Sequence, residues 1–276
     1  MDGVVGLDTA CDVWNELEKS CSTLDPNPTT TTSHEVWTKY RPLYGAIRDG
    51  HWDKAQDIFS KDEKALTVKF NYNHDRALHV AISTCKHFHV VANLLMKIKH
   101  EKLLNDDLLT ARNKLNPLHR AAMVGNTTAA QLLVKENIRW LFTTDNQHLL
   151  PIHRAIFGSH KETFLYLLRV TKENIKLSEE HPICERPFKG KKSGALLVNI
   201  IGIGLMDVAY DLIKEYPSIA TMKDGRSNPL KSIAGKWDTY FSGAQYNFYQ
   251  RFVYSCLSSL ALHSYRPDEV LIYMFL

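Results

Sequence analysis

The chain has 276 residues, of which 44% are hydrophobic and 23% are charged, and its formal net charge at neutral pH is +4. This is the composition of an ordinary globular protein that can bury a core. The positive surplus is not gathered into one block, so the sequence shows no basic stripe for generic nucleic-acid binding.

Targeting signals and cysteines give a consistent expectation for the compartment. The N-terminus carries Asp2 and Asp8 and lacks a basic region followed by an apolar run, so no signal peptide is predicted. No stretch approaches the roughly 20 apolar residues that cross a bilayer. The five cysteines lie far apart and form no Cys-x-x-Cys pair, which favours reduced thiols over a disulfide framework. The chain as it stands is expected to be cytoplasmic.

The first part of the chain, residues 1–33, is polar and is predicted to be a flexible segment. It contains Asp25-Pro26-Asn27-Pro28 followed by the threonine run Thr29–Thr32. Clusters of proline, asparagine and threonine of this kind are typical of linkers.

A short core related to Pro-Leu-His-x-Ala then recurs along the chain. Its copies lie at 42–46, 77–81, 117–121, 151–155, 195–199 and 229–234. Three of the five spacings between their anchor residues are 34 or 35 residues. The longer spacings indicate insertions, of which the larger is a predicted loop at 172–194. Self-similarity at such a period predicts a solenoid.

Each copy has the parts of a helix-turn-helix unit. Proline suits the first turn of a helix, where its missing N–H is not needed. Glycines that can adopt a left-handed conformation follow the first helix, at Gly50, Gly125, Gly158 and Gly204. A second helix with one apolar face comes next, as in the copies with Ala130, Leu132 and Leu133 and with Phe164, Leu165, Leu167 and Leu168. Turn residues precede each proline, at 112–114, 145–147 and 224–226.

These features resemble ankyrin repeats, most specifically in the third and fourth copies. The family motif has threonine before the proline, where this chain has Asn116, Leu150 and Asn228. Asparagine can still cap a helix, but leucine cannot. The resemblance implies an all-α fold, an ankyrin-repeat solenoid of helix-turn-helix repeats with short hairpin finger turns. We expect five to six repeats over 37–256 and a capping or truncated tail at 257–276.

A second resemblance concerns both ends of this repeat array. Tyr40-Arg41-Pro42-Leu43-Tyr44 is similar to the opening repeat of the plant ankyrin proteins with a C-terminal PGG membrane domain, the accelerated-cell-death and increased-salt-tolerance types. The segment Phe248–Cys256 resembles the closing part of their array. The resemblance implies plant defence or stress signalling. This chain has neither a Pro-Gly-Gly motif nor the membrane spans, so it resembles a form without the plasma-membrane part of its relatives.

Two functions follow, and both remain open. The first is a protein-interaction scaffold that holds a protein partner on the concave side of the solenoid. The alternative is the cytosolic regulatory domain of a multi-pass membrane protein, channel- or transporter-like, whose membrane part is missing. From the repeat register, the expected partner contacts are Arg112, Lys114, Arg120, Asp145, Asn146, Gln147, Arg154 and Arg226.

Patterns that suggest other chemistry have structural alternatives. The residues His74, His79, Cys85, His87 and His89 form the densest group of metal-ligand types, but no paired motif completes a four-ligand zinc set. Gly202-Ile203-Gly204 has Asp207 where a dinucleotide fingerprint needs a third glycine. No cysteine or histidine lies in a catalytic signature. We therefore predict no catalytic residues, no metal, no cofactor and no enzymatic activity.

Two other surfaces also allow two interpretations. The basic group in the 172–194 loop, with Lys189, Lys191 and Lys192, could contact anionic lipid head groups or be a solvated insertion. The aromatic residues at 240–254 could dock a partner. They are more typical of a cap, because a terminal repeat must cover an apolar face that has no next neighbour.

Overall fold

The computed structural model describes residues 31–71, 73–103, 109–180, 186–189 and 192–222, together with Pro229 and Ser232. The chain divides into two compact units, Met1–Cys184 and Glu185–Leu276. The predictions for residues 1–30, for Arg226, for the aromatic residues at 240–254 and for the tail lie outside the described residues.

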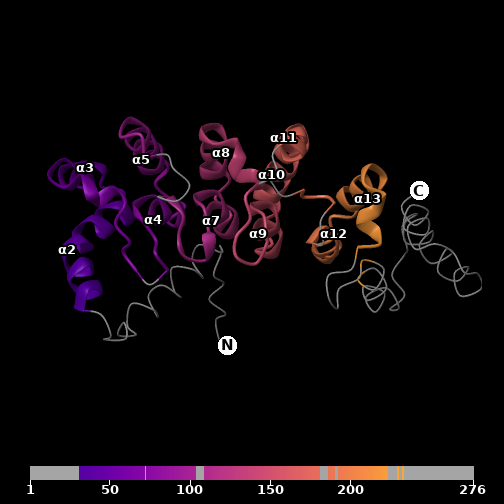
Figure 1. The fold of residues 1–276 in the computed structure, drawn as a ribbon, viewed down its shortest axis with the longest axis horizontal. Coiled ribbons are helices and arrows are strands. Elements are labelled where there is room, and N and C mark those ends of the chain that lie inside the picture. The colour runs from indigo at the N-terminus through magenta and orange to yellow at the C-terminus, as the bar shows by residue number, and fades with distance from the viewer. Residues whose placement is uncertain are drawn as a thin grey trace, which may run out of the picture. The chain divides into compact units, whose positions relative to one another are not determined.

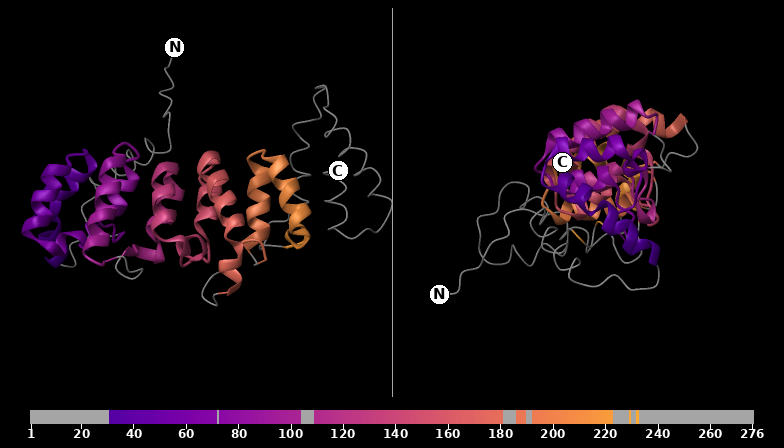
Figure 2. Two further views of the ribbon diagram at one scale, coloured as in Figure 1. Left: turned by 90° about the horizontal axis from the view of Figure 1, so that it is seen from above. Right: turned by 90° about the vertical axis from the view of Figure 1, so that its left-hand side faces the viewer.

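The first unit is a row of helix pairs. Its first helices are α2 (Thr31–Arg48), α4 (Ala77–Ser83), α7 (Pro117–Val124) and α9 (Pro151–Phe157), and its second helices are α3 (Trp52–Lys61), α5 (Phe88–His100), α8 (Thr127–Glu136) and α10 (Lys161–Glu173). Helix α2 packs beside α4, α4 beside α7 and α7 beside α9, while α8 packs between α5 and α10. Figure 1 shows α4, α7 and α9 below α5 and α8, and Figure 2 shows the pairs side by side. The predicted all-α solenoid of helix-turn-helix repeats is confirmed.

Helix α7 shows how the motif residues set the boundaries of a repeat. The Asn116 side chain caps its start by accepting from the His119 N–H at 2.9 Å, and Pro117 occupies the first turn. Gly125 ends the helix with a φ of 72°, a left-handed conformation that suits a residue without a Cβ. Leu118, Ala121 and Ala122 are buried, as a helix packed against neighbours on two sides requires.

Short 3₁₀ helices follow three of the second helices and complete the core. They are η1 (Glu63–Leu66), η3 (Ile138–Phe142) and, in the second unit, η4 (Pro217–Ala220). Trp140 and Phe142 of η3 are fully buried. The large side chains of η3 therefore fill the space at the end of its pair, while small alanines let the first helices approach.

Several local predictions need correction. Helix α2 begins at Thr31, inside the segment predicted as flexible, so Pro42 lies in the helix interior rather than in its first turn. Gly158 has a right-handed φ of −77°, and Ser159 (φ 59°) takes the left-handed conformation instead. Leu165, predicted on the apolar face of α10, is 41% exposed. Within the predicted 172–194 loop, helix α11 (Ile175–Glu180) follows α10 almost directly, so that segment is partly helical.

The second unit contains the fifth copy of the motif. Helices α12 (Lys192–Gly202) and α13 (Met206–Glu215) are joined at Gly204, whose φ is 83°. A helix pair therefore forms although the motif is degraded here, because Leu196 and Leu197 still bury an apolar face. Phe188 is buried and stacks on Tyr216 with ring centroids 4.7 Å apart. None of the described helices of either unit is long and apolar enough to span a membrane.

Candidate functional site

Finger turns project before three of the first helices. We call residues 70–75 the second finger, residues 111–115 the third finger and residues 145–149 the fourth finger. A backbone hydrogen bond closes each one, from Phe70 N–H to Asp75 (2.8 Å), from Ala111 N–H to Leu115 (2.8 Å) and from Asp145 N–H to Leu149 (3.0 Å). In the third finger the tip includes the short η2 turn, Arg112–Lys114.

Neighbouring fingers are hydrogen-bonded to one another. The Arg112 N–H donates to the Asn73 carbonyl and the Asn146 N–H donates to the Asn113 carbonyl, each at 2.9 Å. Each bond joins the first tip residue of one finger to the middle tip residue of the finger before it, so the fingers are in register. The last tip residues, His74, Lys114 and His148, all have a φ of 57°. The last tip residue thus has the same left-handed conformation in all three fingers, whereas Asn113 (φ 63°) makes the third tip left-handed at its middle residue as well.

The histidine of the motif joins each finger to its helix. The ring Nδ1 atoms of His79, His119 and His153 accept from the backbone N–H of Arg76, Asn116 and Leu150, at 3.4, 3.3 and 3.2 Å. An Nδ1 that accepts leaves the ring proton on Nε2. In His119 this Nε2 lies 3.0 Å from the Leu149 carbonyl of the next finger.

Burial holds His79 and His119 in the neutral form. Burial is the largest cause that lowers the pKa of His79 and of His119, in each case to about 4. Neighbouring arginines lower it further, while Asp75 beside His79 and Asp145 beside His119 oppose the shift. A neutral imidazole can accept on one side and donate on the other, as the repeat requires. This hydrogen-bonding role explains why His119 and His153 occupy the histidine position of the motif.

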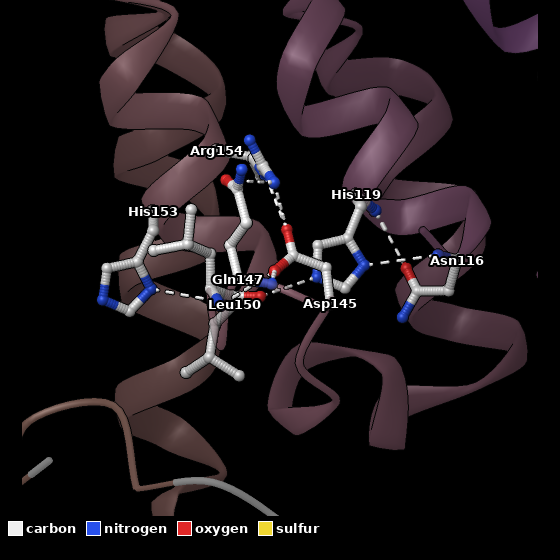
Figure 3. Close-up of polar contacts among 8 residues, drawn as sticks. Asn116, His119, Asp145, Gln147, Leu150, His153 and Arg154 are labelled. Atoms are coloured by element: carbon white, nitrogen blue, oxygen red, sulfur yellow. Dashed lines mark hydrogen bonds and ion pairs between the residues drawn. The ribbon is translucent and has the colours of Figure 1, made fainter. Parts of the chain in front are cut away.

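Two buried ion pairs neutralise the acids of the fingers. In the fourth finger, Asp145 accepts from Arg154 Nε at 2.8 Å and pairs with its Nη2, and Gln147 accepts from the same guanidinium at 3.1 Å (Figure 3). The other Asp145 oxygen accepts from the N–H groups of Gln147 and Leu149. Asp75 of the second finger pairs with Arg120 of α7, which joins two repeats.

The partner contacts predicted from the sequence differ in how exposed their side chains are. Lys114, Asn146 and Gln147 are exposed, and Arg112 and Arg154 are partly buried. Arg120 and Asp145 are only 3% and 2% exposed. Ion pairs inside the unit hold Arg120 and Asp145, so of the expected partner contacts these two are buried. Arg226 lies outside the described residues.

Four exposed tip residues are not among the partner contacts predicted from the sequence. These are Asn73, His74, Asn113 and His148. A signal was present in the sequence, since each finger has a carboxamide followed directly by a basic residue, as Asn73-His74, Asn113-Lys114 and Gln147-His148. The signal is hard to recognise because the second finger is longer than the other two and His74 lies in a segment rich in metal-ligand residue types.

The suggested zinc ligands have other roles. His79 is buried beneath its finger, and His89 Nε2 lies 3.0 Å from the Gly50 carbonyl. Across the described part of the chain, no group of three or more histidine, cysteine or acidic side chains could hold a metal ion. Cys85 is disulfide-bonded, so the expectation of reduced thiols is wrong for this residue.

Comparison with known proteins locates the repeats. Residues 78–178 match the family model for ankyrin repeats (3 copies). No curated protein matches the chain. Among solved structures, a chain in the complex of the yeast ribosomal protein Rps3 with its chaperone Yar1 is 21% identical with a TM-score of 0.40. The match covers 48% of this chain and 93% of that one.

Proposed function

Because residues 78–178 are ankyrin repeats, a protein–protein interaction module, we propose that this chain is a scaffold that holds a protein partner on the tips of its fingers and its first helices. The observation that carries the proposal is the contrast between the two layers of each finger. The histidines and the acids below the tips are buried and hydrogen-bonded, whereas Lys114, Asn146 and Gln147 at the tips are exposed. Residues that build the fold are thus separated from residues that can vary with the partner.

The geometry favours binding because the tips are ordered before a partner arrives. Each tip is closed by its own backbone bond, joined to its neighbour at 2.9 Å and supported from below by a histidine. Ordering loops and side chains on association costs free energy, so a surface that is already ordered retains more of its contact energy. Binding residues on loops that a rigid scaffold positions are common in proteins.

The first helices add an apolar anchor beside the fingers. Phe157 of α9 is 42% exposed and lies one helical turn after Arg154. Its ring centroid is 6.4 Å from that of His153. Aromatic residues dominate the energetics of protein interfaces, so we propose Phe157 as a central contact of the partner.

We further propose, from the resemblance of residues 37–256 to the plant PGG-domain proteins, that the scaffold serves plant defence or stress signalling. In this proposal full-length relatives associate with the plasma membrane. The alternative, the cytosolic regulatory domain of a multi-pass membrane protein, predicts a longer transcript that encodes several apolar spans after residue 256. Sequencing the transcript decides between the two forms.

The experiment compares two matched double variants of the full chain. The first combines Lys114→Glu with Phe157→Ala on the finger and first-helix side. The control combines Lys135→Glu on α8 with Leu165→Ala on α10, which are also an exposed lysine and an apolar side chain about two-fifths exposed. Each protein is used for affinity capture from plant tissue, and the affinity for the recovered partner is then measured.

We expect the partner to bind the wild type and the control alike and to be lost from the first variant. Single surface changes alter stability by about 0.5 kcal/mol or less, so all three proteins should unfold at similar denaturant concentrations. Equal binding by both variants would place the partner on another surface. Loss of binding by the control alone would assign it to the second helices.

A further inference from the structure

The aligned fingers place equivalent side chains in two rows. The middle tip residues, Asn73, Asn113 and Gln147, are carboxamides, and the last tip residues, His74, Lys114 and His148, are basic. All six are exposed, and the interfinger bonds fix their register. We call this set the amide–base row. A carboxamide beside a base therefore recurs on three successive fingers.

The row is set in positive potential. Lys69 is exposed just before the second finger, and Lys114 and Arg112 lie in the third. The two acids of these fingers are buried, Asp75 against Arg120 and Asp145 against Arg154. Among the described finger residues no carboxylate is exposed.

The pKa of His74 is lowered, which agrees with a positive potential around it. Partial burial is the main cause that lowers its pKa, and the charges of Lys69 and Arg76 lower the pKa further. Only Asp75 acts in the opposite direction. The local field around this end of the row therefore disfavours an added positive charge and favours an anion.

Exposed acids lie on the second helices. Asp53 and Asp57 are exposed on α3, and Glu162 and Glu173 are exposed on α10. Exposed cations lie on the same helices, among them Lys54 on α3 and Lys161 on α10. The second helices thus carry both signs of charge, whereas the described finger residues carry exposed cations and no exposed carboxylate. Interfaces arranged so that one sign of charge meets the other gain specificity and association rate.

We propose that the amide–base row binds an extended acidic segment of the protein partner. One carboxylate of the segment pairs with Lys114, and others accept an N–H from the imidazoles of His74 and His148. The carboxamides bond the peptide backbone of the segment. A carboxamide both donates and accepts, which matches the N–H and C=O of a peptide. Phosphate oxygens only accept, so the repeated amides match a peptide backbone better than a phosphate backbone. This inference rests on the proposed scaffold function and specifies the chemistry of its partner.

The distance between neighbouring fingers determines how far apart the acidic residues of the bound segment must lie. Packed helices lie about 8–10 Å apart, and so do the repeats that carry the fingers. A peptide in the extended polyproline II conformation advances about 3.1 Å per residue with three residues per turn, so every third side chain faces the same side and one turn spans about one repeat. The fitting segment has an acidic residue at about every third position.

The test uses a fluorescent peptide of about ten residues with glutamate at every third position, a length that spans the three fingers. A control peptide carries glutamine at the same positions. Fluorescence anisotropy measures binding to the full-length chain, to Lys114→Glu and to the matched control Lys135→Glu on α8. A single-stranded oligonucleotide of similar length is the competing probe.

The acidic peptide should bind the wild type and Lys135→Glu equally, and both the glutamine peptide and Lys114→Glu should weaken binding by about tenfold or more. Raising the salt from about 0.1 M to about 1 M should also weaken it, because the Debye length falls from about 10 Å to about 3 Å. Equal affinity for both peptides, or tighter binding of the oligonucleotide, would overturn the inference. If the partner is still captured through the finger side in those cases, the scaffold function stands and only the acidic chemistry fails.

Discussion

The Nε2 atom of His119 lies 3.0 Å from the backbone oxygen of Leu149, a residue 30 positions further along the chain. The Nδ1 atom of the same ring accepts from the Asn116 N–H at 3.3 Å. One buried side chain thus connects the start of α7 to the base of the fourth finger. The tip that we assign to partner binding depends on this interior contact.

Replacing His119 should therefore destabilise the first unit strongly. In His119→Ala, the buried Asn116 N–H loses its partner, which costs about 1–3 kcal/mol, and the Leu149 carbonyl keeps only the Asp145 N–H. The lost ring volume adds a cavity term. We expect the free energy of unfolding to fall by about 2–4 kcal/mol. Urea titration followed by circular dichroism measures this change. The exposed His148→Ala, in the fourth finger, is the control and should change it by less than about 0.5 kcal/mol.

The buried histidines also predict acid sensitivity. His79 and His119 have a pKa of about 4 in the folded chain, against about 6.5 when unfolded. Between these values the unfolded chain binds protons that the folded chain does not, so stability decreases as the pH falls from 6.5 to 4. Each histidine contributes about 1 kcal/mol per pH unit in this window, and none above it.

Urea titrations at a series of pH values measure the slope. His119→Gln should reduce the slope by about one histidine's share. A slope unchanged in that variant would show that the ring does not remain neutral in the fold.

Much of the fold could be predicted because the repeat motif combines local signals with buried contacts. The Asn116-Pro117 cap, the Gly125 stop and the small alanines of α7 all favour the same helix. The local pattern placed one left-handed residue a position too early. Gly158 adopts a right-handed conformation because Ser159, the next residue, makes the turn.

The candidate site was harder to predict because charge alone does not reveal exposure. Arg120 and Lys114 look equivalent in the sequence, yet Arg120 is buried against an acid 45 residues earlier in the chain. Such a pairing depends on how two repeats stack and has no local signature. The amide–base row became visible only when interfinger bonds aligned fingers of unequal length.

Two glycines in different backbone conformations allow a matched pair of alanine substitutions. Gly125 has a φ of 72°, and an added Cβ would lie 2.5 Å from Nδ1 of His160. That ring also lies against the previous repeat through Nε2 and the Met123 carbonyl, at 2.8 Å. Gly125→Ala should therefore destabilise the fold by about 1–2 kcal/mol from the backbone alone, with the clash in addition.

Gly45 lies inside α2, and an added Cβ there would meet nothing within 4 Å. Gly45→Ala should stabilise the chain by about 0.5–1 kcal/mol, because alanine loses less entropy in a helix. Thermal unfolding of the two variants should shift in opposite directions. A shift of the same sign in both would contradict these local conformations.

The Asp75–Arg120 pair allows a double-mutant cycle. Arg120→Met keeps much of the side-chain volume but leaves Asp75 buried without its guanidinium partner. Removing one partner of a buried pair costs about 3–5 kcal/mol. Lys114→Met, six residues earlier and exposed, should cost less than about 0.5 kcal/mol.

Adding Asp75→Asn to Arg120→Met should recover part of this loss. Asparagine carries no charge to desolvate, and it can still bond to Asn71, whose amide nitrogen lies 3.0 Å from Asp75. The coupling free energy from the four unfolding titrations should then be about 1–3 kcal/mol in favour of the pair. Additive effects would mean that the two charges do not interact in the fold. Arg120 would in that case be free to turn outward, and it would return to the set of possible partner contacts beside Lys114.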